Sequence, residues 1–118
     1  MLKYSYSPHS KFKVGAAIKT DDGKIFTGCN IENVSYGLSM CAERVALFNA
    51  VSKGYTKFEA IAISSSGEKS SFPCGACRQF LAEFNLDLFV YLDKDESVYK
   101  LSELIPHVFD RNQLKQEN

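Results

Sequence analysis

Three cysteines in two short motifs constrain the fold of this chain more than any other feature. Cys41 opens a Cys-Ala-Glu triplet that ends at Glu43, and Cys74 and Cys77 lie in a Pro-Cys-Gly-Ala-Cys segment that starts 30 residues after it, at residue 73. Thiolates are good zinc ligands, and a site with three protein ligands leaves a position open for water, as in catalytic zinc sites. If the sulfurs share one ion, the fold must bring the two motifs together.

The composition is that of a small globular protein. The chain has 118 residues, of which 45% are hydrophobic and 24% charged, so we expect a single domain over residues 1–118. Fourteen basic and fourteen acidic residues cancel, which argues against a nucleic-acid partner. We find neither an apolar run of about 18 residues, which a membrane span needs, nor a signal region. These features predict a cytoplasmic protein with no membrane partner, in which metal binding is favoured over disulfides.

Apolar patterns predict five strands. The predicted strands are residues 12–18, 24–31, 58–63, 86–92 and 98–101. Asp21-Asp22-Gly23 is typical of a hairpin turn between the first two strands. The short connection between the last two also favours an antiparallel pair, since a parallel return needs a dozen or more residues. The third strand is apolar on both faces, as expected of a central strand that is covered on two sides.

Two main helices alternate with these strands. The predicted helices are residues 39–53 and 74–84, followed by a helical turn at 101–105. Gly54 is placed to end the first helix, Pro73 to start the second, and Pro106 to stop the last turn. The first helix is apolar around most of its circumference, so we expect the sheet on one side and a second partner, such as another subunit, on the other. The polar residues after Asp110 predict a frayed terminus. These elements predict an α/β sandwich around one mixed sheet.

The motif residues fall where helix geometry suits a metal site. Cys74 and Cys77 are three residues apart, so they are neighbours on one helix face. First-turn side chains lean toward the helix N-terminus, which lets both Cys41 and Glu43 reach the tip of their helix. Positive partial charge at both helix N-termini favours thiolates. Three thiolates on one Zn²⁺ still leave a net negative charge that makes a bound water less acidic, and Arg44 can offset it through hydrogen bonds to sulfur.

These motifs resemble those of a known enzyme group. Segments 41–44 (Cys-Ala-Glu-Arg) and 73–79 (Pro-Cys-Gly-Ala-Cys-Arg-Gln) look like the motifs of the zinc nucleoside and nucleotide deaminases. Within that group, the chain is similar to the small homotetrameric cytidine deaminases from Tyr6 to about Phe109, including the Gly-Cys-Asn-Ile-Glu-Asn segment 28–33. The resemblance implies a three-layer α/β/α sandwich with a mixed five-stranded sheet. Its N-terminal helix would be shortened or absent here.

The resemblance also implies the chemistry. One Zn²⁺ per subunit would bind Cys41, Cys74 and Cys77. Glu43 would shuttle protons between water, N3 of the pyrimidine and the leaving amine, and the backbone of Ala42 would contact the amide edge of the base. The reaction would be hydrolytic deamination of cytidine and 2′-deoxycytidine to uridine and 2′-deoxyuridine, with release of ammonia, in pyrimidine salvage. A carboxylate suits this task if a dry, negatively charged site raises its pKa.

The rest of the nucleoside would be held by residues from other segments. Asn30 and Glu32 are two apart in an extended segment, so both point the same way and could grip the ribose hydroxyls. Phe12 would stack on or beside the base. In the family, the positions of Tyr36 and Phe109 approach a neighbouring subunit's site. The resemblance therefore implies a homotetramer with its sites at subunit interfaces.

Plainer interpretations of the same residues stay open. Cys29 could complete a closed four-cysteine structural site, although Glu43 would then lack a role, and the two cysteines of the second motif could be a redox pair. Asn30 and Glu32 could be turn and capping residues, and Phe12 could belong to the core. Rival functions are a deaminase of another small aminated heterocycle, including a nucleoside antibiotic, and a zinc-stabilised interaction module without turnover. A deaminase acting on tRNA or single-stranded DNA fits the zero net charge poorly.

Overall fold

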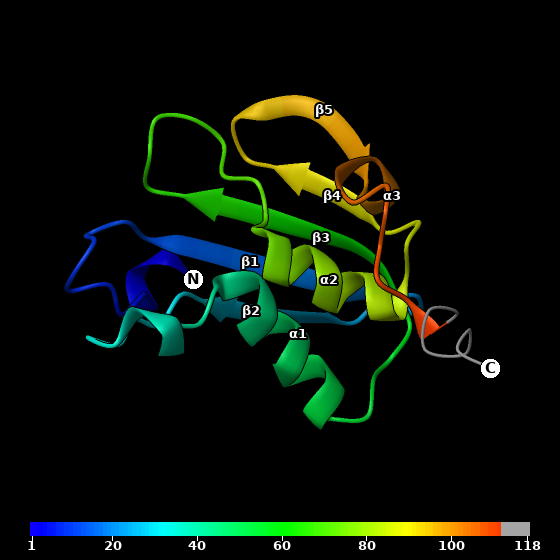
Figure 1. The fold of residues 1–118 in the computed structure, drawn as a ribbon, viewed down its shortest axis with the longest axis horizontal. Helices are drawn as coiled ribbons and strands as arrows, with labels where there is room; N and C mark the ends of the chain where they lie inside the picture. Colours follow the sequence, from blue (N-terminus) through cyan, green and yellow to red (C-terminus); the bar gives the residue numbers. More distant parts are fainter. Residues whose placement is uncertain (112–118) are drawn as a thin grey trace.

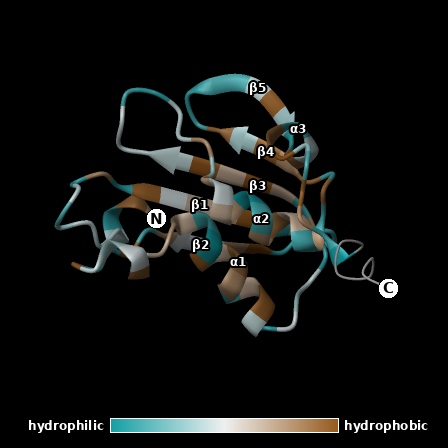
Figure 2. Ribbon diagram, viewed as in Figure 1, coloured by the Kyte–Doolittle hydropathy of each residue, from teal (hydrophilic) through white to brown (hydrophobic). Residues whose placement is uncertain are grey.

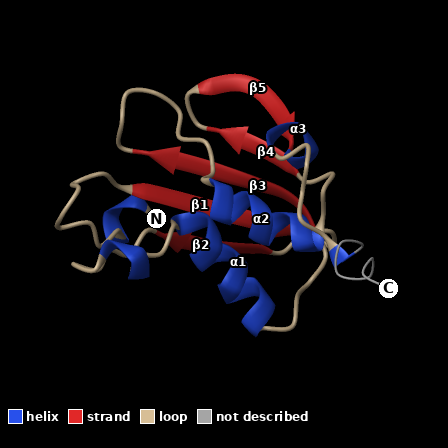
Figure 3. Ribbon diagram, viewed as in Figure 1, coloured by secondary structure: helices blue, strands red, loops and turns tan. Residues whose placement is uncertain are grey.

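The structure is a computed structural model that describes residues 1–111, and its strands form one mixed sheet in the order β2-β1-β3-β4-β5 (Figures 1 and 3). The strands are β1 (Val14–Thr20), β2 (Ile25–Cys29), β3 (Phe58–Ser65), β4 (Phe89–Leu92) and β5 (Asp95–Lys100). Strands β3 and β4 run parallel, while the other neighbouring pairs are antiparallel. The predicted mixed five-stranded sheet is therefore confirmed.

Helices cover one face of this sheet. The helical elements are η1 (Leu2–Tyr4), η2 (Tyr36–Leu38), α1 (Ala42–Ser52), α2 (Gly75–Phe84) and α3 (Leu101–Leu104). Helices α1 and α2 lie side by side in front of the strands in Figure 1. No helix within residues 1–111 combines the length and the apolar composition that a bilayer span requires.

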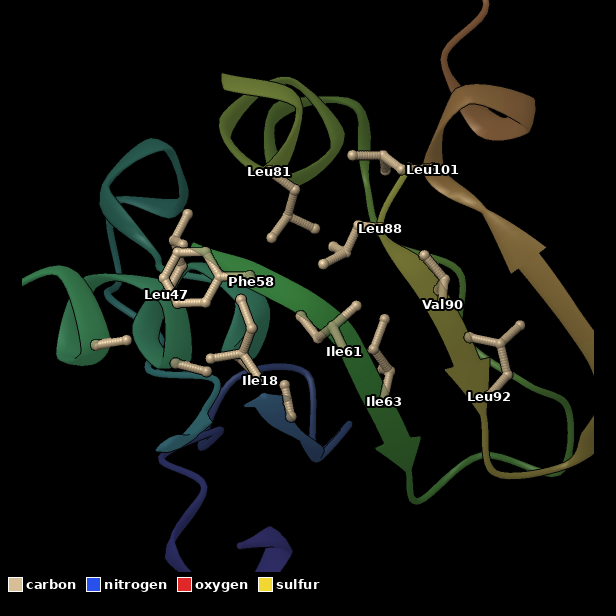
Figure 4. Packing of buried hydrophobic residues seen from close by; sticks show 14 of the residues in the cluster. Ile18, Leu47, Phe58, Ile61, Ile63, Leu81, Leu88, Val90, Leu92 and Leu101 are labelled. Carbon is tan, nitrogen blue, oxygen red and sulfur yellow. The ribbon is translucent and has the colours of Figure 1, made fainter. Parts of the chain in front are cut away.

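The core lies between these helices and the sheet. Alternate residues of β1 and β3 point toward α1 and α2, so Ile18, Ile61 and Ile63 are fully or almost fully buried. Leu47 of α1 and Leu81 of α2 pack against them from the helix side (Figure 4). The hydropathy colouring shows the same division, with brown segments along the central strands and teal ones in the loops (Figure 2). The layer of helices is thus anchored to the sheet by aliphatic packing.

The opposite face of the sheet is more open than the sequence predicts. Ala62, between two buried isoleucines of β3, is exposed, and Phe89 and Tyr91 of β4 are 42% and 45% exposed. A covering on both sides of β3 was expected, but within residues 1–111 the second helical layer is reduced to η1, where Met1 lies over Gly15. This agrees with the expected shortening of the N-terminal helix.

The predicted boundaries lie within three residues of the observed ones, and the last hairpin shows one of the largest differences. Its turn contains only Asp93 and Lys94, because β5 already begins at Asp95. Charged residues that are typical of a turn here form the start of an edge strand, where charged side chains are common. The Asp95 carboxylate accepts hydrogen bonds from the Tyr99 hydroxyl (2.6 Å) and the Ser97 amide (2.9 Å). The predicted fraying after Asp110 falls mainly on residues 112–118, outside the described residues.

Candidate active site and metal centre

Helix α1 is placed by its contact with β2. A Cβ atom on Gly28 would lie 2.4 Å from the backbone nitrogen of Ala46 and 2.8 Å from the carbonyl oxygen of Ala42. Only glycine allows two backbones to approach this closely. The contact fixes the first turn of α1 against the sheet, and that turn carries Cys41 and Glu43.

The three motif cysteines converge as predicted. Cys41 and Cys74 are the N-caps of α1 and α2, and Cys77 is buried in the first turn of α2. The Sγ atom of Cys74 lies 3.7 Å from that of Cys41 and 3.5 Å from that of Cys77, and all three lie within 4.8 Å of one another. Tetrahedral zinc with Zn–S bonds of about 2.3 Å needs sulfurs separated by roughly 3.8 Å. The three sulfurs therefore fit one zinc ion.

A fourth cysteine ligand is excluded. Gly28 faces α1, so its neighbour Cys29 points to the opposite face of the sheet, where it pairs with Gly15 beneath Met1. Within residues 1–111, Cys41, Cys74 and Cys77 are the only group of three potential ligands that converges in this way. The closed four-cysteine site considered from the sequence is thus wrong, and the three-sulfur site keeps a position for a further ligand.

Arg44 lies beside the sulfurs, where the sequence predicted it. Its Nη2 donates a hydrogen bond of 3.5 Å to Cys41 Sγ. A hydrogen bond with Cys77, joined by the one from Arg44, lowers the pKa of Cys41 to about 5. The pKa of Cys77 is raised, chiefly by its hydrogen bond to Cys41 and by burial. The hydrogen bond from Arg44 thus favours the thiolate form of Cys41, which is the form that binds a metal.

Glu43 reaches the same site from α1. The residue is only 4% exposed, yet it contributes to the wall of a cavity beside Cys41. Burial raises the pKa of Glu43 to about 7, and the negative charge on Cys41 adds to the increase. A carboxyl group whose pKa lies near neutral pH can both accept and release a proton there. Glu43 therefore has the properties expected of a proton shuttle.

The cavity has a volume of about 320 Å³. Most of the predicted substrate-binding residues line it, namely Phe12, Asn30, Glu32 and Ala42. Arg44 and Cys77 lie outside its wall. Its lining residues are Ser10, Phe12, Val14, Asn30, Glu32, Ser39, Met40, Cys41, Ala42, Glu43, Ser71, Phe72 and Cys74. The fold thus brings the cysteine motifs and the segment around residue 30 to one opening.

Asn30 and Glu32 also organise the loop that precedes β1. Glu32 Oε1 accepts hydrogen bonds from the backbone amides of His9 (2.9 Å) and Ser10 (3.1 Å), and the Ser10 hydroxyl donates to its other oxygen. The bond from Ser10 lowers the pKa of Glu32. Asn30 donates to the Phe12 carbonyl oxygen (2.8 Å) and accepts from the Val14 amide (3.0 Å). Both residues therefore help to hold the loop before β1, and their role toward ribose stays a prediction.

Several lining residues were missed from the sequence. Phe72 is 43% exposed, and its ring packs edge-on against Tyr99 of β5, with 5.3 Å between ring centroids. Ser71 lies next to it, and Ser39 and Met40 immediately precede Cys41. Adjacency to the two cysteine motifs was the signal that could have identified all four, because residues next to a metal ligand must pass close to the site.

Tyr36 and Phe109 do not line this cavity. Tyr36 is 65% exposed on η2 and packs edge-on against His9. Phe109 is 57% exposed, and its carbonyl oxygen accepts a hydrogen bond of 2.7 Å from the Gln79 side chain. Both aromatic rings are thus presented on the surface of this chain rather than to its own site.

Comparisons with known proteins agree with this geometry. Residues 1–93 match the family model for the cytidine and deoxycytidylate deaminase zinc-binding region. The chain belongs to this deaminase family. It is 46% identical over 115 residues to a probable cytidine deaminase of Dictyostelium discoideum, covering 95% of this chain and 78% of that protein. It is also 46% identical over 114 residues to a cytidine deaminase of Sporosarcina psychrophila, covering 93% of this chain and 84% of that one.

A solved structure of a cytidine deaminase has the same fold as this chain. The crystal structure of cytidine deaminase from Burkholderia pseudomallei superposes with a TM-score of 0.86 and 46% sequence identity, covering 92% of this chain and 90% of that chain. The membership of the deaminase family, predicted from the two cysteine motifs, is therefore confirmed. The three convergent sulfurs form a possible metal site, as expected of a family whose model is a zinc-binding region.

Proposed function

We propose that residues 1–118 form a single catalytic domain that hydrolyses cytidine and 2′-deoxycytidine to uridine and 2′-deoxyuridine, with release of ammonia, in pyrimidine salvage in the cytoplasm. The observation that carries this proposal is the shared cavity. A buried carboxyl group, Glu43, and the sulfurs of Cys41 and Cys74 line the same opening as the aromatic ring of Phe12. Metal, proton shuttle and base would thus meet in one place.

The chemical step would use the residues of the two helix tips. Cys41, Cys74 and Cys77 would hold zinc, which when bound supplies Lewis-acid activation of water. Glu43 would accept a proton from that water and deliver it to N3 of the base. It would then take the proton of the hydroxyl group now on C4 and deliver it to the departing amine. Its raised pKa suits both directions of transfer. Arg44, through its hydrogen bond to Cys41, would reduce the negative charge that the thiolates place on the site.

The nucleoside would be held by the remaining lining residues. Phe12 is 39% exposed and lines the cavity, where its ring would pack on the base, and the Ala42 backbone would contact the amide edge of the base. Asn30 and Glu32 would use their remaining hydrogen-bonding capacity on the ribose hydroxyls. Among the described residues, the cavity wall has no lysine, arginine or histidine, and Glu32 adds negative charge. This favours a free nucleoside over a nucleotide, whose phosphate would be repelled.

A substrate panel tests this function. The zinc-loaded protein is incubated with cytidine, 2′-deoxycytidine, 2′-deoxycytidine 5′-monophosphate, adenosine and an aminated nucleoside antibiotic, and ultraviolet absorbance is followed. We expect turnover of the first two, loss of turnover after chelation, and recovery after zinc is added back. Turnover of the antibiotic alone would indicate that the protein deaminates this rival substrate and not cytidine. Zinc binding without turnover of any compound would favour an interaction module.

We also propose that the sites are completed in a homotetramer. On the surface near α1 and α2, five apolar side chains are 36% to 69% exposed to solvent. Exposed apolar side chains that gather in this way are typical of an interface with another protein. These residues are Tyr36, Leu38, Phe48, Phe80 and Phe109. Because Tyr36 and Phe109 are exposed and do not line their own cavity, they are available to a neighbouring site.

Mixed assemblies test the shared sites. Light scattering gives the oligomeric state, and a Glu43→Gln subunit is then co-refolded with a Tyr36→Ala subunit. If Tyr36 acts on a neighbour's site, the mixture regains activity, because an intact Glu43 can meet an intact Tyr36 from the other subunit. A fully active monomer, or a mixture no better than its parts, would contradict the proposal.

A further inference from the structure

Gly67, in the loop between β3 and α2, lies against the ring of Phe12. A Cβ atom at residue 67 would be 2.8 Å from Cε1 and 3.6 Å from Cζ of that ring. The first distance is well inside van der Waals contact, for which carbon atoms prefer about 3.5–4.0 Å. The backbone φ of Gly67 is not in the positive range that favours glycine. A side chain at residue 67 is therefore opposed by the ring and not by the backbone conformation.

The backbones on either side of this contact are tied together. Lys13 and Ser66 exchange two hydrogen bonds, from the Ser66 amide to the Lys13 carbonyl oxygen (2.8 Å) and from the Lys13 amide to Ser66 Oγ (2.9 Å). The Phe12 carbonyl oxygen is held by Asn30, and the Phe12 amide donates to Ser10 Oγ (3.0 Å). Since both chains are fixed, a methyl group at residue 67 must displace the phenylalanine ring.

Gly67 contacts the ring from outside the cavity. Phe12 lines the cavity, whereas Gly67 is absent from its wall among the described residues. A change at residue 67 therefore reaches the substrate space through the Phe12 ring. A displaced ring would change the shape of the space that the base would occupy.

We propose that Gly67 is a positioning residue that sets the place of the Phe12 ring against the substrate base. This inference rests on the proposed function, because it takes Phe12 as the residue that packs on the base. Gly67 itself touches neither substrate nor metal. Its effect should therefore appear in the affinity for the nucleoside and not in the proton transfers at Glu43.

The test is the variant Gly67→Ala, with Glu68→Ala as the matched control from the same loop, since Glu68 is exposed and lies outside the cavity wall. We expect Gly67→Ala to raise KM for cytidine by roughly threefold to tenfold, the range for a side chain forced off its preferred rotamer. We expect kcat, zinc content and thermal midpoint to change little, and Glu68→Ala to match the wild type. An unchanged KM in Gly67→Ala would overturn the inference.

A double-mutant cycle identifies the route of the effect. In the Phe12→Ala background, Gly67→Ala should cause no additional rise in KM, because the ring that it displaces is gone. A full additional rise would show that residue 67 acts by another route. If Phe12→Ala alone leaves KM unchanged, the proposed role of Phe12 in the function fails instead.

Crystal structures of the wild type and Gly67→Ala decide the physical claim without any activity. The expected difference is a displaced Phe12 ring over an unchanged Lys13–Ser66 pair. A ring in its original position, with residues 66–72 shifted to make room, would overturn the inference even in an inactive protein.

Discussion

The two halves of the candidate site, which comprises the cavity and the three sulfurs, are positioned by different means. The helix-tip half consists of Cys41, Glu43, Cys74 and Cys77, all in the first turns or N-caps of α1 and α2. The loop half consists of Ser10, Phe12, Asn30, Glu32 and Phe72. The first half depends on a buried core and on the backbone contact at Gly28, whereas the second depends on hydrogen bonds between side chains and backbone. Under the proposed function, the helix-tip half would carry out the chemistry and the loop half would bind the nucleoside.

The largest expected effect comes from removing a ligand of the helix-tip half. Cys77→Ala deletes a buried sulfur that the other two ligands cannot replace. We therefore expect a zinc content well below one ion per chain, together with loss of turnover. The control is Cys29→Ala, which lies on the opposite face of the sheet and should keep its zinc. Metal analysis by mass spectrometry checks both. Equal zinc in the two variants would contradict the three-sulfur site.

The next largest effect is expected at Glu43 of the same half, where a substitution can remove proton transfer without disturbing the fold or the metal site. Glu43→Gln keeps the shape of the side chain but removes its ability to carry a proton, so kcat should fall by roughly 10²- to 10⁴-fold. Zinc content and thermal midpoint should stay near those of the wild type. Glu83→Gln, an exposed change on α2, is the control. Comparable kcat in both variants would remove Glu43 from the mechanism.

A third prediction concerns the support of the helix-tip half. Gly28→Ala places a methyl group 2.4 Å from a backbone atom of α1, so the helix must move. We expect a loss of about 3 kcal/mol in the free energy of unfolding, toward the upper end for overpacking, together with weaker zinc retention. Gly37→Ala is the control, because a Cβ there meets nothing within 4 Å. Denaturant titration measures both, and equal stabilities would refute the rigid contact.

The smallest effect is expected in the loop half. Glu32→Gln keeps one oxygen for the His9 and Ser10 amides but replaces the oxygen that accepts from the Ser10 hydroxyl. We expect faster amide exchange in residues 8–12 and a severalfold higher KM, with a change in stability below about 1 kcal/mol. Hydrogen exchange followed by mass spectrometry tests this, with Glu68→Gln as the control. A destabilisation as large as that of Gly28→Ala would remove the contrast between the halves.

The same contrast explains what could be read from the sequence. The helix-tip half was predictable because helix starts, residue spacing and ligand chemistry all agree at Cys41, Cys74 and Cys77. The positions of the strands followed from apolar patterns, and the pairing of the first two followed from the Asp-Asp-Gly turn. The start of β5 at Asp95 could not be predicted, because a charged edge strand and a charged turn have the same composition.

The loop half was only partly predictable for a physical reason. Asn30 and Glu32 were identified through the family motif, but their bonds to the loop before β1 depend on backbone groups that every sequence has. The contact between Gly67 and Phe12 joins two distant loops and follows no periodic pattern. The place of Phe72 next to the second cysteine motif indicates that it lies near the site, but the path of the loop decides that its side chain lines the cavity.

The close packing of α1 on Gly28 also bears on protein design. A backbone pressed against another backbone has no side-chain atoms that could adjust to a new surrounding. Anyone who grafts the Cys-Ala-Glu-Arg turn onto a different scaffold must therefore transfer the glycine of the adjoining strand with it. Without that strand, the transplanted ligands would keep their chemistry but would no longer be held in the correct position.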